Sequence, residues 1–178
     1  VTLIPLAGKG SRFVKAGYKD PKPLLPVSGK PMIIQANNQL PNSELNAYVC
    51  LKSHVDEYSI KTELEAVQPG CDITVIDKVT EGQAITCEIG LSKVSGNSPL
   101  LIAACDNGML WNRARYRGLI EDTTVDAIVW TFRGHPSSRE HPEMYGWVTT
   151  QADVATGVSV KMPISDTPEN DHAVVGTF

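Results

Sequence analysis

The chain has 178 residues, of which 42% are hydrophobic and 20% charged, and its formal net charge is -4. This length is that of one ordinary domain with a sizeable core, so folding needs neither disulfides nor a metal. No apolar run approaches the roughly 18 residues of a membrane-spanning helix, and the few basic residues form no long run. We therefore expect neither a membrane nor a nucleic acid as a partner.

Cysteine usage points to a reducing environment. The four cysteines, Cys50, Cys71, Cys87 and Cys105, form no CxxC pair, and three of them lie in apolar stretches. Such cysteines usually pack as small hydrophobic side chains, whereas a disulfide framework or a zinc site needs closer spacing. The first residues also lack the pattern of a signal peptide. These features favour a cytoplasmic protein.

Short apolar runs and amphipathic stretches alternate along the first two thirds of the chain. The runs that we expect to form strands are Val1–Ala7, Ala47–Lys52, Cys71–Asp77, Leu100–Asp106 and Asp126–Arg133. The stretches that we expect to form helices are Pro31–Leu40, His54–Val67, Gly82–Val94 and Met109–Ile120. Strands that alternate with helices predict βαβ units around a mainly parallel sheet, with helices on both faces.

The character of the chain changes after His135. Three further strands are expected there with little helix between them, at Tyr145–Gln151, Gly157–Lys161 and His172–Phe178. We expect these strands to be antiparallel additions that complete the same sheet. The predicted fold class is α/β, a Rossmann-like three-layer α/β/α architecture with a mainly parallel mixed sheet, and residues 1–178 are interpreted as one domain.

Ligands of open sheets bind at the carboxyl ends of the strands, a position that Gly8–Arg12, Asp77–Gln83 and Cys105–Asn107 take in the predicted fold. The first of these is a glycine-spaced turn, which lets backbone N–H groups approach an anion closely. Phe13 stands where a dinucleotide fingerprint has its third glycine, and the spacing of a P-loop is absent. A Rossmann-type dinucleotide enzyme is therefore disfavoured. By itself, the turn is also consistent with a tight strand-to-helix connection that carries a surface arginine.

Lys22 lies in a proline-rich segment, Pro21–Met32, with a proline on each side of it. The prolines restrict the backbone and hold the lysine in an extended loop, as a fixed positive charge close in sequence to the glycine turn. The alternative is a solvated charge in a loop.

Together these two segments resemble the sugar-phosphate nucleotidyltransferase family, in which G-x-G-[ST]-R is followed, after a short spacer, by P-K-P-L-[LI]-P-V-x-G-K-P-M. The match is close over Leu3–Ile33. Weaker similarity continues downstream at Glu81–Ala84, Leu101–Asn107, Tyr145–Val148 and Val158–Phe178. The resemblance implies the nucleotidyltransferase fold over essentially the whole chain.

The resemblance also implies a reaction of the EC 2.7.7 type. A nucleotidyl group passes from a nucleoside triphosphate to a sugar 1-phosphate or related phosphomonoester, pyrophosphate leaves, and Mg²⁺ is the cofactor. Nucleotide-sugar and polysaccharide biosynthesis use such products. The attacking phosphate oxygen is already ionised, so the reaction needs positioning and charge neutralisation rather than a protein nucleophile. Consistently, no Ser-His-Asp or Cys-His arrangement is evident.

The resemblance assigns roles to particular residues. Arg12 would stabilise the departing pyrophosphate, Lys22 would bridge the α-phosphate and the acceptor phosphate, and Asp106 would hold Mg²⁺. The residues implied to bind the nucleotide are Leu6, Ala7, Gly8, Lys9, Gly10, Ser11, Gly82 and Gln83. Those implied to bind the acceptor are Tyr145, Gly146 and Lys161. Simpler alternatives stay open: Asp106 as a turn residue in Asp-Asn-Gly, Gly82 and Gln83 as a helix start, and Lys161 as a strand-edge lysine.

Two departures from the family pattern bear on substrate and activity. The family's Glu-Lys-Pro segment reads here as Val160, Lys161, Met162 and Pro163, so we expect an acceptor other than an ordinary hexose 1-phosphate. The family's second metal-binding Asp is expected beyond Phe178, so we interpret the chain as a domain that lacks its C-terminal part. These departures motivate the alternative of a non-catalytic, degenerate or regulatory nucleotide-binding domain. The nucleobase stays open, as does assembly into a homo-oligomer.

Overall fold

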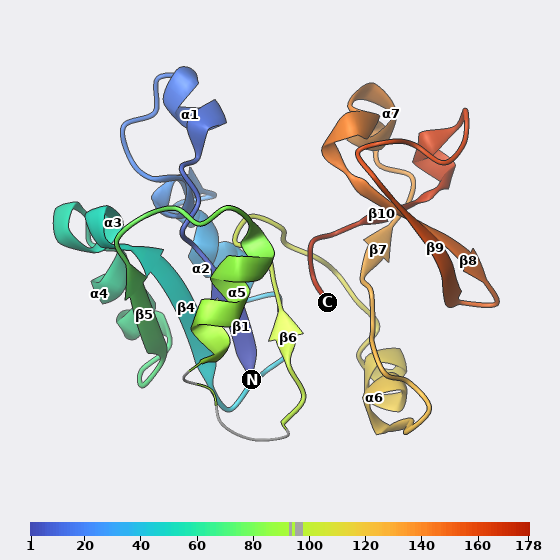
Figure 1. Ribbon diagram of the computed structural model, residues 1–178, viewed down its shortest axis with the longest axis horizontal. Coiled ribbons are helices and arrows are strands. Elements are labelled where there is room, and N and C mark those ends of the chain that lie inside the picture. Colours follow the sequence, from blue (N-terminus) through green and yellow to red (C-terminus); the bar gives the residue numbers. More distant parts are fainter. Residues whose placement is uncertain (93, 95–97) are drawn as a thin grey trace. The chain divides into compact units, whose positions relative to one another are not determined.

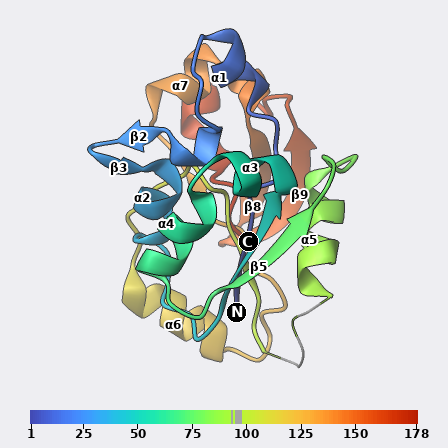
Figure 2. The same cartoon turned by 90° about the vertical axis from the view of Figure 1, so that its left-hand side faces the viewer.

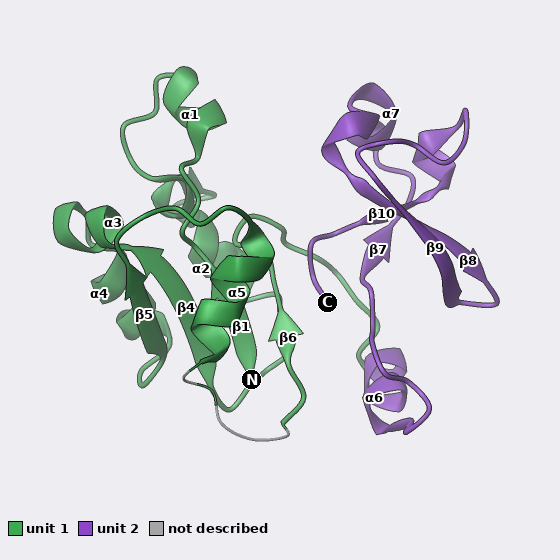
Figure 3. Ribbon diagram, in the orientation of Figure 1, with its two compact units in different colours: residues 1–113 green, residues 114–178 purple. Residues whose placement is uncertain are grey.

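The computed structural model describes residues 1–92, 94 and 98–178, and the chain divides into two compact units. Unit 1 is Val1–Arg113 and unit 2 is Ala114–Phe178 (Figure 3). The prediction of one domain over the whole chain stays a prediction. No helix in the described part of the chain is long and apolar enough to cross a membrane.

Unit 1 is built on a parallel sheet of four strands in the order β5-β4-β1-β6 (Figure 1). The strands are β1 (Thr2–Pro5), β4 (Asn46–Leu51), β5 (Asp72–Ile76) and β6 (Leu101–Ile102). The central strand β1 pairs with β4 through Leu3 and Ala47 and with β6 through Leu3 and Ile102. The predicted α/β fold with a parallel central sheet is therefore confirmed.

The remaining elements of unit 1 are short. Its helices are α1 (Ser11–Lys15), α2 (Met32–Asn37), α3 (Lys52–Glu57), α4 (Ile60–Val67) and α5 (Gln83–Leu91). A 3₁₀ turn, η1 (Lys22–Leu24), and a small antiparallel ribbon of β2 (Pro26–Val27) and β3 (Lys30–Pro31) lie between α1 and α2 in the sequence.

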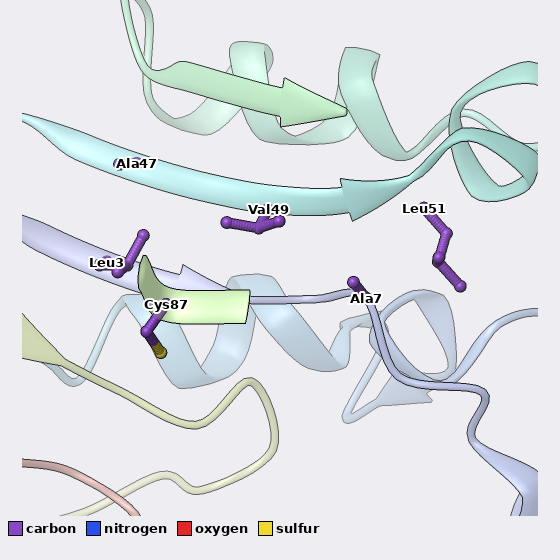
Figure 4. Close-up of a cluster of buried hydrophobic side chains, with 6 residues drawn as sticks. All are labelled: Leu3, Ala7, Ala47, Val49, Leu51 and Cys87. Carbon is purple, nitrogen blue, oxygen red and sulfur yellow. The ribbon is translucent and has the colours of Figure 1, made fainter. Parts of the chain in front are cut away.

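Successive side chains of a strand point to opposite faces of the sheet, and both faces of this sheet are covered. One face packs against α5 in a buried cluster of Leu3, Ala7, Ala47, Val49, Leu51 and Cys87 (Figure 4). On the other face, the Tyr48 hydroxyl donates to Asn37 Oδ1 at the end of α2, at 3.3 Å. Figure 2 shows α2 and α4 on one side of the sheet and α5 on the other. These are the three layers of the predicted architecture.

Unit 2 holds a separate antiparallel sheet in the order β7-β10-β8-β9. Its elements are α6 (Arg113–Glu121), β7 (Thr131–Phe132), α7 (Pro136–Glu140), η2 (Pro142–Met144), β8 (Gly146–Gln151), β9 (Val154–Val160), η3 (Pro168–Asn170) and β10 (His172–Val174). The expectation that the late strands complete the parallel sheet is wrong. The physical reason is local: Ala152 and Asp153 both adopt positive φ in a tight hairpin, so β8 pairs directly with β9.

Several predicted elements are shorter than expected. His54–Val67 is two helices rather than one, because Tyr58 has extended backbone between α3 and α4 and donates its hydroxyl to the Lys19 carbonyl at 3.2 Å. The strand expected over Leu100–Asp106 is shortened to β6, Leu101–Ile102, after which the N–H of Ala103 still donates to the Leu3 carbonyl at 3.0 Å. The helix expected over Gly82–Val94 ends at Leu91, and Lys93 lies outside the described residues. In unit 2, Asp126–Arg133 contributes only β7, and Met109–Ile120 becomes α6.

We predict that the protein loses stability above pH 9. Burial raises the pKa of the Cys50 thiol to about 12, and burial together with Cys71 and Cys50 raises the pKa of Tyr48. Above pH 9 the unfolded chain releases the Cys50 proton while the folded chain keeps it, so the free energy of unfolding falls as the pH rises. Each such group contributes up to about 1.4 kcal/mol per pH unit. The free energy of unfolding, measured by urea denaturation at pH values from 8 to 11, should fall less steeply with pH in Cys50→Ala than in the wild type. The same dependence on pH in both proteins would contradict the assignment.

Candidate functional site

A pocket of about 420 Å³ opens in unit 1 at the carboxyl ends of β1 and β6. Four segments line it: the end of β1 with the glycine turn, the start of η1, the connection from β5 into the first turn of α5, and the loop after β6. The predicted residues that it brings together are Leu6, Ala7, Gly8, Gly10, Ser11, Arg12, Lys22, Gly82, Gln83 and Asp106. Lys9 is exposed and is not among the lining residues.

Gly10 lies where the glycine turn packs against Lys22 at the start of η1. It has φ +58°, in the left-handed region that favours glycine, and it is the N-cap of α1. A Cβ placed on Gly10 would lie 3.2 Å from the Cβ of Lys22. The glycine turn and the proline-flanked lysine are therefore packed against each other, and the glycine leaves the room that this contact needs.

Opposite charges meet inside the pocket. The Lys22 ammonium forms an ion pair with the Asp106 carboxylate, from segments 84 residues apart in the sequence. The lysine side chain is 20% exposed and the aspartate 33%, so solvent screens the pair only in part. The Lys22 Nζ also lies 5.8 Å from the centre of the Phe13 ring. The structure thus places the lysine and the carboxylate, which the sequence predicted separately, in direct contact.

Cys105 lines the same pocket, beside Asp106. Burial raises the pKa of its thiol to about 11, although the neighbouring Lys22 charge acts in the opposite direction. The thiol is therefore neutral at physiological pH, and a neutral thiol is a poor nucleophile. This agrees with its interpretation as a small hydrophobic side chain.

Two hydroxyl groups in the pocket are not among the residues predicted from the sequence. Thr80 and Thr86 both line it, and their Oγ1 atoms are 2.6 Å apart. Thr86 falls one helical turn after Gln83, so helical periodicity from the predicted helix start would have placed it on the same face. For Thr80 the only signal is its place just before a helix start, where threonines often bond to backbone groups.

The three predicted acceptor residues lie together in unit 2. Tyr145 immediately precedes Gly146, the first residue of β8, and its carbonyl accepts the N–H of Lys161 at 2.9 Å. The Tyr145 hydroxyl lies 2.6 Å from Ser137 Oγ, which in turn lies 2.6 Å from His135 Nδ1. His135 caps α7 by accepting the N–H of Ser137. In the described ranges, no group of three or more His, Cys, Asp or Glu side chains could hold a metal.

We predict that Gly10→Ala impairs the pocket more than Gly17→Ala does. Both glycines have positive φ, so each alanine is strained by roughly 1–2 kcal/mol, but a Cβ at Gly17 meets nothing within 4 Å. Only the Gly10 variant also pushes against Lys22. Both variants should lose thermal stability, and Gly10→Ala should lose more because of this additional contact. Triphosphate binding, measured by calorimetry, should weaken mainly in Gly10→Ala, and equal affinities would contradict the packing argument.

Comparison with solved structures shows the same fold in several enzymes. The nucleoside-diphosphate-sugar pyrophosphorylase from Vibrio cholerae RC9 matches with a TM-score of 0.70 at 19% identity, over 99% of this chain and 73% of that one. A UDP-glucose pyrophosphorylase complexed with UDP-glucose matches with a TM-score of 0.72 at 20% identity, over 99% and 74%. The inositol-1-phosphate CTP transferase from T. maritima matches with a TM-score of 0.70 at 11% identity, over 99% and 68%.

Sequence comparison identifies the family. No curated protein matches the chain. The model of the MobA-like NTP transferase domain matches residues 2–154, which is most of the chain and includes the whole lining of the pocket. The predicted relationship to nucleotidyltransferases is thereby confirmed: the chain belongs to the family of MobA-like NTP transferase domains.

Proposed function

We propose that this protein transfers a nucleotidyl group from a nucleoside triphosphate to a sugar 1-phosphate or a related phosphomonoester, with release of pyrophosphate. The observation that carries the proposal is the pocket of unit 1, which gathers Arg12, Lys22 and Asp106 around a glycine turn at the carboxyl ends of two parallel strands. The family match supports the class of reaction.

The charges of the pocket suit phosphates. A guanidinium such as that of Arg12 can bind two oxygens of one phosphate group at once, whereas the Lys22 ammonium acts as a compact point charge. In the proposed reaction, Arg12 stabilises charge on the departing pyrophosphate. Lys22 neutralises the α-phosphate and the acceptor phosphate, so that two anions can approach each other. The acceptor oxygen is ionised before it attacks, so the reaction needs no protein nucleophile. The Cys105 thiol of the pocket, which stays neutral, agrees with this.

Lys22 must change partner for this role. In the structure its ammonium is paired with Asp106, so an incoming phosphate competes with a carboxylate for the same cation. Transfer of the lysine to the phosphate leaves the Asp106 carboxylate without its cation. The free-energy cost of transferring Lys22 from Asp106 to the phosphate is therefore lower when a second cation binds Asp106 together with the triphosphate.

The donor set of the pocket fits Mg²⁺ as that second cation. Mg²⁺ at nucleotide sites is usually held by one or two carboxylates, waters and the phosphates themselves. Asp106 supplies one partly exposed carboxylate, and the described residues offer no larger group of ligands. We propose that Asp106 holds Mg²⁺ bound to the triphosphate. When bound, the ion would neutralise phosphate charge and orient phosphate oxygens.

We propose that Tyr145, Gly146 and Lys161 bind the acceptor. Their mutual contacts in unit 2 support this assignment. Val160, in place of the family's glutamate, removes a carboxylate that would accept bonds from sugar hydroxyls. An acceptor with a different pattern of hydroxyl groups is compatible with the likeness to the T. maritima enzyme, whose name gives inositol 1-phosphate.

The alternative function is a nucleotide-binding domain without catalysis. The observation that favours it is the single, lysine-paired carboxylate of the pocket. Pyrophosphate release with a panel of triphosphates and phosphorylated acceptors separates the two functions. Triphosphate binding without turnover for any pair would establish the alternative.

We predict that Lys22→Met lowers the rate of Mg²⁺-dependent pyrophosphate release about 100- to 1,000-fold, as expected for the loss of one preorganised electrostatic contact. Arg12→Met should have an effect of the same order. Lys30→Met is the matched control, because Lys30 is exposed in the same proline-rich segment and does not line the pocket. Wild-type rates in Lys22→Met would refute the proposed role.

We predict opposite effects of Asp106→Asn with and without metal. In buffer with EDTA, the variant should bind the triphosphate about fivefold more tightly, because a partly exposed pair of this kind is worth up to about 1 kcal/mol. With Mg²⁺ present, the variant should lose most of the gain in affinity that the metal gives the wild type. Calorimetry checks both, with Asp126→Asn at an exposed site in unit 2 as control. Unchanged metal-free affinity would show that the pair does not restrain Lys22.

A further inference from the structure

Helix α2 is firmly packed in unit 1. Three of its side chains, Ile33, Ile34 and Ala36, are at most 5% exposed. At its last residue, Asn37, the side-chain oxygen accepts the hydroxyl of Tyr48 from the neighbouring sheet at 3.3 Å. Side chains in a close-packed interior cannot shift without opening voids, so α2 is a rigid element to which less regular segments can be attached.

The first half of α2 holds the segment that carries Lys22. The backbone N–H of Met32, the first residue of α2, donates to the carbonyl of Leu25, just after η1, at 2.9 Å. The side-chain amide of Gln35 donates to the Val27 carbonyl, also at 2.9 Å. The turn η1, which begins at Lys22, packs on α2 as well. The backbone of Lys22 is therefore placed relative to this helix.

The other end of the same helix holds the loop that carries Asp106. The indole N–H of Trp111 donates to the carbonyl of Gln39, just beyond the end of α2, at 2.7 Å. Carbonyls at the end of a helix have no acceptor role further along it, so a side-chain donor satisfies them. In addition, a Cβ placed on Gly108 would lie 2.5 Å from Gln39 Oε1, so the backbone of the loop lies directly against the Gln39 side chain.

Asp106 thus lies between two fixed points of the chain. Before it, the N–H of Ala103 donates to a carbonyl of β1 at 3.0 Å. After it, the indole of Trp111 attaches the loop to the end of α2. A short segment that is fixed at both ends has few conformations open to it, so pairing with Lys22 costs the carboxylate little conformational entropy. Both partners of the ion pair are therefore attached to one helix.

We propose that Trp111 is a positioning residue, which holds the Asp106 loop on α2 so that the carboxylate lies beside Lys22. Trp111 is not among the lining residues of the pocket, so it acts through the loop and not by contact with a ligand. This inference rests on the proposed function, because its effect is measured on the binding of a nucleoside triphosphate. Without the attachment, Asp106 would restrain Lys22 less and would also be less well placed for a metal-bound triphosphate.

The test variant is Trp111→Phe. It keeps an aromatic ring near the Arg113 guanidinium, which lies 5.8 Å from the ring centre, and it removes the N–H donor. Calorimetry measures the binding of each common nucleoside triphosphate in buffer with EDTA and in buffer with Mg²⁺. Without metal, the variant should bind the preferred triphosphate about threefold more tightly, which is within the value of one hydrogen bond. With Mg²⁺, it should bind about threefold more weakly than the wild type, for the same reason.

A double-mutant cycle identifies the group through which Trp111 acts. In the Asp106→Asn background, Trp111→Phe should change neither affinity by more than about 1.5-fold, because the carboxylate that it positions is absent. Trp147→Phe is the matched control, since the Trp147 indole also donates to a backbone carbonyl, that of Pro142, at 3.2 Å in unit 2. The control should lower Tm and leave both affinities unchanged.

Three results would overturn the positioning role of Trp111. The first is a loss of affinity by the same factor with and without Mg²⁺, which is the result of a purely structural role. The second is a lower Tm with both affinities unchanged. The third is an effect of Trp111→Phe that persists in full in the Asp106→Asn background. Failure of the wild type to bind any triphosphate in either buffer would instead overturn the proposed function, and the positioning role with it.

Discussion

The parallel pairing of β1 with β4 on one side and β6 on the other is the constraint on which the candidate site depends. Parallel neighbours end at the same edge of a sheet, so the glycine turn after β1 and the Asp106 loop after β6 emerge together although they are far apart in the chain. Packing of α5 on β1 and β4 brings the first turn of that helix to the same edge. The polar residues of the pocket are therefore positioned by an apolar core that contains none of them.

The parts of this arrangement that have a periodic or motif signal could be predicted from the sequence. The strands around Leu3 and Ala47 are continuous apolar runs, and strand ends are the expected place for ligands, so the edge and most of its residues could be predicted. The Lys22–Asp106 pair could not, because nothing in either segment specifies the other. The separate sheet of unit 2 could not be predicted, because apolar alternation indicates a strand but not the strand with which it pairs. There, the two-residue hairpin at Ala152 and Asp153 decides the pairing.

The segments that line the pocket differ in charge. On the edge of the glycine turn, Arg12 and Lys22 are suited to a polyanion, and the Lys22 charge is balanced by Asp106. On the edge of α5, the lining residues Val79, Thr80, Gly82, Gln83 and Thr86 carry no charge. Substitutions on the edge of α5 can therefore change the lining of the pocket without removing the charges of Arg12, Lys22 and Asp106.

The neutral thiol of Cys105 has a consequence for the long-term behaviour of such a site. A thiolate beside Asp106 would add a second negative charge where the proposed triphosphate would bind, and it would react readily with oxidants and electrophiles. Burial prevents both by keeping the proton on sulfur at physiological pH. A cysteine can therefore line the pocket just after β6 without adding a negative charge or a reactive thiolate to it.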